Sequence, residues 1–281
     1  MIPEFDEKAP RPVPALEDQD GTTLARLVGV MRRLLAPNGC PWDREQSLET
    51  LRKYVLEEAC EVIDAIDSGN RDALREELGD LLLQVVFQAE LLRKEGKFAI
   101  DDVVAGIVEK LVSRHPHVFG DVKADTSEEV LTNWEKLKAK EKKGRGILEG
   151  VPRSLPALVR AQRVGEKVSR VGFDWTDARG SIAKVHEEIG ELEIAMHSGT
   201  ASDREEELGD ALFALVNLAR HLNVDAEGAL RRTIDKFTTR FAHVEARVRE
   251  NHGGWGDTGR DKLPLETLDQ YWEEAKRAKK E

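Results

Sequence analysis

The strongest constraint on the fold of this chain is that its sequence repeats itself. LEEACEVIDAI (56–66) aligns with HEEIGELEIAM (186–196), and REELGDLLLQVVF (75–87) aligns with EEELGDALFALVN (205–217) at the same spacing. Two further blocks follow in the same order: KLVSRHPHV (110–118) aligns with KFTTRFAHV (236–244), and NWEKLKAKEKK (133–143) resembles YWEEAKRAKKE (271–281). Agreement in residue type, order and spacing indicates an internal duplication. We predict two domains, 22–143 and 153–281, joined by a linker at 144–152.

Each half shows helical periodicity. In TTLARLVGVMRRLLA (22–36), apolar residues recur at helical intervals after a Thr pair suited to capping. The same pattern predicts further first-half helices at about 47–67, 71–95, 100–114 and 127–143. Aromatic residues make up only 5% of the chain and strand periodicity is absent. The predicted fold class is all-α, with two tandem helical bundles.

EELGD heads a long apolar segment in both halves, at 76–80 and 206–210. After Asp80 the segment is apolar nearly all round, and we expect it to form a buried central helix. Carboxylates placed at the head of such a helix need an explanation, because burying an uncompensated charge is costly.

Paired carboxylates recur on two successive helices of each half. Glu58 and Glu61 are three residues apart and share a helix face, and Glu77 and Asp80 do the same on the next helix. A short connection makes these helices antiparallel neighbours, so both pairs can face each other across the seam. The equivalent second-half residues are Glu188, Glu191, Glu207 and Asp210.

Four converging carboxylates repel one another, and a bound cation would relieve that repulsion. All the ligands are hard oxygens, which favours Mg²⁺, with Mn²⁺ as a substitute. Mg²⁺ held by carboxylates on one side commonly binds substrate phosphate on the other, which indicates phosphoryl chemistry. The simpler alternative for any one pair is a solvated acidic face, but the set occurs twice, at the head of the most apolar helix of each half.

Basic residues distinguish the halves. Lys236 and Arg240 lie four apart on one helix face and match Lys110 and Arg114, so either pair could hold phosphates or form a solvated stripe. The second half has Lys184 and Arg204 where the first has Tyr54 and Leu74. Trp272 and its counterpart Trp134 could stack on a base or pack a terminal helix.

Composition narrows the range of binding partners and cellular compartments. A net charge of -11 argues against a nucleic-acid partner, and two unpatterned cysteines suit a reducing compartment. We expect no membrane span, no signal peptide, a disordered acidic tail at 1–21 and a cytoplasmic location.

EEACE and EEIGE, each followed by EELGD, resemble the EExxE…ExxD signature of the all-α nucleoside triphosphate pyrophosphohydrolases, and the chain from 22 to 281 is similar to tandem MazG-type members. NGCPWD (38–43), RHPHVF (114–119), VPRSLPAL (151–158) and VGFDW (171–175) strengthen the likeness.

The resemblance implies Mg²⁺-dependent hydrolysis of nucleoside triphosphates between the α and β phosphates, a homodimer and a nucleotide-pool house-cleaning role. It assigns the metal to the acidic residues above and nucleotide contacts to the following second-half residues: Lys184, Glu187, Arg204, Lys236, Arg240 and Trp272. We expect Glu187 or Glu188 to orient the attacking water. The second half is favoured for catalysis, because the first lacks counterparts of Lys184 and Arg204.

Two alternatives remain open at this point. One is a pyrophosphatase dedicated to a single metabolite, related to dUTPases or phosphoribosyl-ATP hydrolases. The other is a non-enzymatic helical interaction module stabilised by a structural metal.

Overall fold

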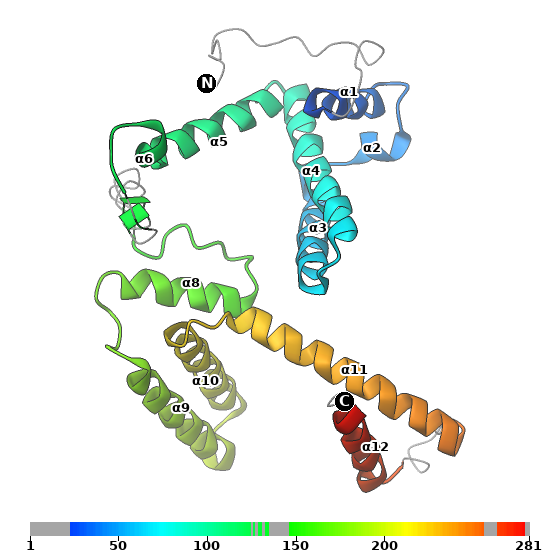
Figure 1. The fold of residues 1–281 in the computed structure, drawn as a ribbon, viewed down its shortest axis with the longest axis vertical. Helices are drawn as coiled ribbons and strands as arrows, with labels where there is room; N and C mark the ends of the chain where they lie inside the picture. The colour runs from blue at the N-terminus through cyan, green and yellow to red at the C-terminus, as the bar shows by residue number, and fades with distance from the viewer. Residues whose placement is uncertain are drawn as a thin grey trace. The chain divides into compact units, whose positions relative to one another are not determined.

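A computed structural model describes residues 23–124, 126, 129–130, 133–134, 146–255 and 263–278. These residues contain α-helices and no strand, which confirms the all-α prediction (Figure 1). The chain divides into two compact units, 1–143 and 144–281. Among the described residues, every helix is too short or too polar to cross a lipid bilayer. The tail at 1–21 lies outside the described residues, as does most of the helix expected at 127–143.

The first unit contains six described helices: α1 (Leu24–Leu34), α2 (Pro41–Glu45), α3 (Leu48–Ser68), α4 (Arg71–Lys94), α5 (Ile100–Arg114) and α6 (Pro116–Phe119). Helices α3 and α4 lie side by side, and α1 crosses the C-terminal half of α4 (Figure 1). The core forms at that crossing, around Val28, Met31, Val86 and Phe87.

Local sequence sets the ends of the α3–α4 hairpin. Ser47 begins α3 with a capping box, in which its hydroxyl accepts from the Thr50 amide and the Thr50 hydroxyl accepts from the Ser47 amide. Gly69, in the left-handed conformation at φ 70°, ends α3, and the side chain of Asn70 caps α4. The turn is therefore short, and α4 runs back along α3.

The second unit contains α8 (Ala157–Ser169), α9 (Ala178–Ser198), α10 (Ala201–His221), α11 (Ala226–His252) and α12 (Leu265–Ala278). Helices α9 and α10 form the counterpart of the α3–α4 hairpin, α8 packs on α10, and α12 packs on α11 (Figure 1). Thr200 and Asp203 form the capping box that begins α10.

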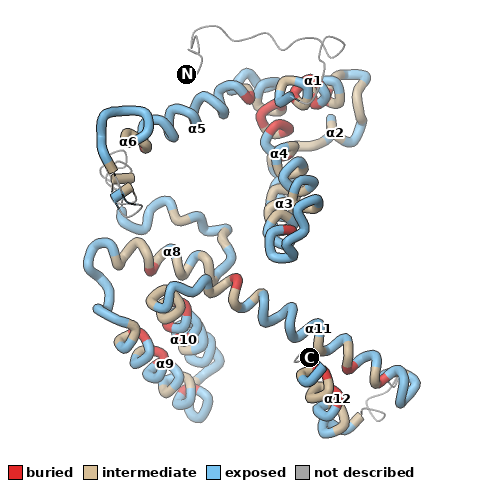
Figure 2. Tube along the Cα trace, viewed as in Figure 1, coloured by how far each residue is buried: buried red, intermediate tan, exposed pale blue. Residues whose placement is uncertain are grey.

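The prediction that α4 is a buried central helix is wrong for its N-terminal half. Leu78, Leu82 and Val85 are 41–50% exposed, whereas the residues around Val86 and Phe87 are buried. Figure 2 shows the buried residues gathered where α4 crosses α1. Among the described residues of its own unit, the first half of α4 packs chiefly on α3, and its other apolar face is exposed.

Candidate active site

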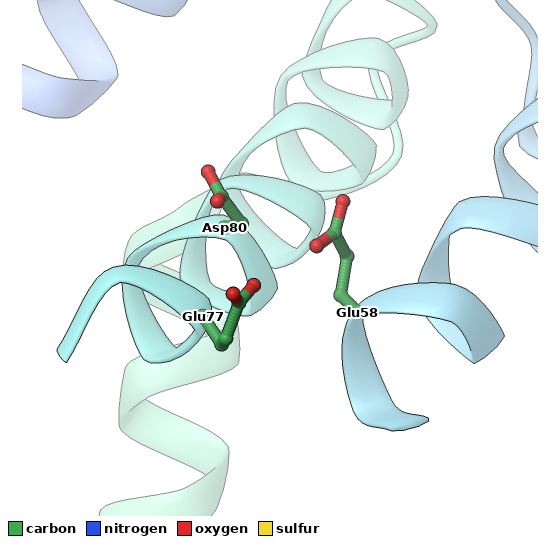
Figure 3. Close-up of side chains that lie close together, drawn as sticks. All are labelled: Glu58, Glu77 and Asp80. Carbon is green, nitrogen blue, oxygen red and sulfur yellow. The ribbon is translucent and has the colours of Figure 1, made fainter. Parts of the chain in front are cut away.

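Three carboxylates of the first unit converge on the seam between α3 and α4. Glu58 extends from α3 toward Glu77 and Asp80 on α4, as Figure 3 shows. One oxygen from each residue lies within 4.8 Å of the others. All three side chains are half-buried. The hairpin therefore brings three of the four predicted carboxylates together.

The second unit builds the same cluster from Glu188 on α9 and from Glu207 and Asp210 on α10, whose oxygens also lie within 4.8 Å of one another. Glu188 is buried, Glu207 is half-buried and Asp210 is exposed. The α9 member of the second cluster is therefore buried in the hairpin, whereas its α10 members are accessible to solvent.

The fourth predicted ligand of each half stands apart from these three-residue groups. Glu61 and Glu191 are exposed, but their charges act on Glu77 and Glu207 respectively. They lie close enough to the clusters for their charges to raise the pKa values of Glu77 and Glu207. Their role as metal ligands stays a prediction.

The clusters shift the pKa values of their own members. Desolvation, followed by the charges of Glu191, Glu188 and Asp210, raises the pKa of Glu207. Glu77 has a raised pKa for the same reasons, with Glu61 the leading charge. The pKa of Glu58 is raised by desolvation and then by the charge of Asp80. Each cluster holds more negative charge than its surroundings compensate.

Lys184 supplies compensation in the second unit only. Its Nζ lies 2.5 Å from Glu188 Oε1 and 2.8 Å from Glu187 Oε1, one turn along α9. Hydrogen bonds to Glu187 and Glu188 raise the pKa of Lys184, so it remains an ammonium. In the first unit Tyr54 takes this position and packs instead against the core and against Trp42.

The donor sets of both clusters fit a hard divalent cation. Carboxylate oxygens at this spacing are the ligands such ions prefer, and the described residues of the clusters offer no imidazole or thiolate. A cation there would relieve the repulsion that raises the pKa values of Glu77 and Glu207.

The MazG nucleotide pyrophosphohydrolase domain family matches residues 46–119 and 179–245, which include both acidic clusters. The chain belongs to this family.

Relatives in the family extend over most of the chain. A nucleoside triphosphate pyrophosphohydrolase of Escherichia coli is 47% identical over 90% of this chain and 96% of its own length. A nucleoside triphosphate pyrophosphohydrolase/pyrophosphatase MazG of Thermotoga maritima is 44% identical over 91% of this chain and 96% of its own length. A nucleoside triphosphate pyrophosphohydrolase of Mycobacterium tuberculosis is 39% identical over 58% of this chain and 50% of its own length.

In this MazG-family chain, two predicted nucleotide contacts lie near the second cluster without joining it. Glu187 is exposed and accepts from Lys184. Arg204 is exposed on the first turn of α10 and donates from Nη1 to the carbonyl oxygen of Gly199 at 2.9 Å. Both are free to reach solvent-borne ligands, and their contacts with nucleotide stay predictions.

The other three predicted contacts lie on the α11–α12 pair. The Arg240 guanidinium lies over the Trp272 ring at 5.8 Å, and Phe237 packs on the same ring at 4.8 Å between centroids. Lys236 is exposed on α11. A cavity of about 660 Å³ adjoins the second acidic cluster and is lined by residues of α8, α9, α10 and the loop at 171–175, and none of these three residues lines it. Within one chain, the structure joins Arg240 to Trp272 but not to the carboxylates.

A polar group among the residues that line this cavity was not predicted from the sequence. Asp174 Oδ1 accepts from Arg220 Nη2 and lies 3.0 Å from His221 Nε2, while Arg220 Nε donates to Asn217 Oδ1 at 2.9 Å. Burial alone would raise the pKa of Asp174, but the hydrogen bond and charge of Arg220, with those of His221, lower it. The sequence does contain a signal for this group. The motif VGFDW includes an acidic residue, Asp174, to which the sequence analysis gave no role.

Proposed function

We propose that the protein hydrolyses nucleoside triphosphates between the α and β phosphates, releasing a nucleoside monophosphate and pyrophosphate, with Mg²⁺ bound by the second acidic cluster. The chain is an enzyme, since its full-length relatives are named for nucleoside triphosphate pyrophosphohydrolysis. The observation that carries the proposal is the convergence of Glu188, Glu207 and Asp210 beside an ammonium group. The non-enzymatic alternative is set aside.

In this proposal the carboxylates bind the cation and the ammonium group of Lys184 binds the phosphates. Glu188, Glu207 and Asp210, with Glu191 beside them, would hold the cation, which would polarise phosphate oxygens and acidify a bound water. Lys184 offers an ammonium within hydrogen-bonding distance of the cluster, suited to the phosphate chain once a cation neutralises Glu188. Glu187, which accepts from Lys184, or Glu188 would orient the attacking water. Mn²⁺, with the same oxygen preference, would substitute.

A homodimer is part of this proposal. Leu208, Leu212 and Leu215 form an exposed stripe on α10 at helical spacing, and Leu230, Ile234, Phe237 and Phe241 form another on α11. Contiguous apolar stripes of this kind mark interfaces. Helices of a second copy packed there would let Lys236, Arg240 and Trp272 approach an acidic cluster that they do not approach within their own chain.

The location proposed is the cytoplasm, where nucleoside triphosphates are made and used. A net charge of -11 supports a free nucleotide, rather than nucleic acid, as the phosphate-bearing partner.

Product analysis tests the cleavage position. With Mg²⁺ and a panel of nucleoside triphosphates, phosphorus NMR should show pyrophosphate and nucleoside monophosphate forming together, and EDTA should stop the reaction. Orthophosphate as the first product would contradict the proposed bond. Turnover of one nucleotide alone would favour the dedicated pyrophosphatase instead.

A further inference from the structure

Lys184 pairs with two carboxylates that differ in exposure. Its Nζ lies 2.5 Å from Glu188 Oε1 and 2.8 Å from Glu187 Oε1, both one turn further along α9. The Glu188 side chain is 6% exposed and belongs to the second acidic cluster. The Glu187 side chain is 57% exposed. One ammonium group therefore bridges a buried carboxylate of the cluster and a carboxylate in solvent.

The pair with Glu188 conflicts with metal ligation by the same carboxylate. Oxygens that bind Mg²⁺ lie about 2.0–2.1 Å from the ion. A divalent cation bound to Glu188 would share that carboxylate with the Lys184 ammonium, and two positive charges so close repel each other strongly beside a buried group. In this structure the ammonium therefore supplies positive charge where a bound cation would supply it.

Glu187 gives the ammonium a second partner. Because Lys184 already donates to Glu187 Oε1, breaking its pair with Glu188 leaves it hydrogen-bonded to an exposed carboxylate. The ordinary lysine pKa of 10.5 keeps the group charged at neutral pH, and hydrogen bonds to Glu187 and Glu188 raise this pKa further. The lysine stem is flexible. Exchange between the two partners thus requires a side-chain rotation and no movement of α9.

The first cluster has no such competitor among the described residues. Tyr54 aligns with Lys184, and its ring packs against the core and lies 6.0 Å from the Trp42 ring. The neighbouring Lys53 places its Nζ over the Tyr54 ring at 4.6 Å from the centroid. The two clusters thus share their carboxylates and differ in whether a lysine pairs with them.

We propose that Lys184 competes with the divalent cation for Glu188, so that metal binding at the second cluster displaces the ammonium and makes it available to the phosphate chain. The inference rests on the proposed function and adds a regulatory step to its metal site. Cation binding and release of Lys184 become one event, so the ammonium faces the phosphates only when the cation is in place. The second cluster consequently binds a cation more weakly than its carboxylates alone would.

Mn²⁺ affinity tests the competition without any turnover. Mn²⁺ would be titrated by electron paramagnetic resonance into the full chain carrying Glu77→Gln, which weakens the first cluster and leaves the second to be measured. In this background Lys184→Met keeps the aliphatic stem and removes the ammonium. It should bind Mn²⁺ about fivefold or more tightly than the background alone, because a site that is blocked most of the time loses affinity in proportion.

Arg204→Met is the matched control for the removal of one positive charge. Arg204 lies one turn before Glu207 on α10, but its Nη1 donates to the carbonyl oxygen of Gly199. Because this exposed charge is screened by solvent and salt, its removal should change Mn²⁺ affinity less than about twofold. Equal increases in Arg204→Met and Lys184→Met would show that the lysine acts through its charge alone, and would overturn the displacement.

Diffraction from wild-type crystals soaked in Mn²⁺ tests the displacement directly, since anomalous scattering locates the ion in the same map as the lysine. The expected result is Mn²⁺ on Glu188, with Lys184 Nζ beyond hydrogen-bonding distance of that carboxylate. Mn²⁺ on Glu188 with the Lys184 pair intact would overturn the inference.

The outcomes separate the inference from the proposed function. Mg²⁺-dependent pyrophosphate release with unchanged Mn²⁺ affinity in Lys184→Met overturns the displacement and leaves the function standing. No pyrophosphate release from the wild type contradicts the function, and the Mn²⁺ titrations still decide the inference because they need no turnover. No Mn²⁺ binding at the second cluster, in wild type or in Lys184→Met, overturns the inference together with the metal part of the proposed function.

Discussion

The two acidic clusters have equivalent carboxylates and different neighbours. Glu58, Glu77 and Asp80 lie at the same spacing as Glu188, Glu207 and Asp210. Among the described residues, only the second cluster has an ammonium group paired with it, from Lys184. Gly165 takes the place of Arg32 at the adjoining helix crossing when VGFDW (171–175) is aligned with NGCPW (38–42). Duplicated hairpins have therefore kept a site that can hold a cation while diverging in the groups around it.

The largest expected effect is the loss of pyrophosphate release when the aspartate of each cluster is replaced, and this loss should differ between the two clusters. Asp210→Asn should lower pyrophosphate release by about 10³-fold, because a cation that stabilises the transition state contributes several kcal/mol. Asp80→Asn, its first-unit match, should lower release less than about tenfold if the first site is not the main catalyst. Steady-state kinetics on both variants measure the difference, and equal losses would remove the asymmetry.

A smaller loss should follow removal of the second unit's ammonium. Lys184→Met keeps the aliphatic stem but cannot stabilise charge on the phosphates, so kcat should fall by about 10²-fold. Tyr54→Phe at the matching position should leave kcat at the wild-type value, because Tyr54 packs against the core through its ring. Wild-type kcat in Lys184→Met would show that this ammonium serves only to balance Glu188.

A substitution at the α1–α4 crossing of the first unit should change the stability of the fold but not the rate of pyrophosphate release. Glu90 is fully buried and pairs with Arg32 and Arg93, so Glu90→Ala should lower the free energy of unfolding by about 3 kcal/mol. Denaturant unfolding measures this loss. Pyrophosphate release at 25 °C should be unchanged, since the second cluster is untouched, and a parallel loss of activity would show that the first unit contributes directly.

The smallest expected effect is the pH dependence that both clusters share. Glu58, Glu77 and Glu207 have pKa values raised above the ordinary 4.5 in the metal-free protein. A raised carboxyl pKa contributes stability below about pH 4.5 that is lost as the pH rises through the raised values. In EDTA these residues should therefore lower the melting temperature with rising pH.

Mg²⁺ should restore that stability most at the higher pH, where the ligands are ionised. Thermal unfolding with and without Mg²⁺ measures the increment. An increment that is equal at pH 4.5 and pH 7.5 would argue against carboxylate ligation.

Much of the scaffold was predictable from the sequence because its determinants are local. The caps at Ser47, Gly69 and Asn70 specify the α3–α4 hairpin, and helical spacing then places Glu77 and Asp80 on one face. The helix predicted at 100–114 matches α5. Convergence of three acidic residues in each unit followed from the antiparallel pairing of the two helices.

The rest depended on contacts that sequence periodicity does not encode. The apolar pattern after Asp80 predicted burial correctly around Val86, but it could not show that Leu78 and Leu82 are 50% and 43% exposed among the described residues. The Asp174–Arg220 pair joins residues 46 positions apart and needs the α8–α10 crossing to form. The cavity beside the second cluster is lined by residues of three helices and a loop, so it was unpredictable for the same reason.

Metal counting and turnover, measured on the same samples, test the central claim that both halves bind a cation and the second performs the hydrolysis. Mn²⁺ would be titrated by electron paramagnetic resonance into wild type, Glu77→Gln and Glu207→Gln, with pyrophosphate release assayed on each. The account predicts weakened Mn²⁺ binding at one cluster in each variant, with release retained in Glu77→Gln and lost in Glu207→Gln. Full release from Glu207→Gln, or its loss only from Glu77→Gln, would contradict it.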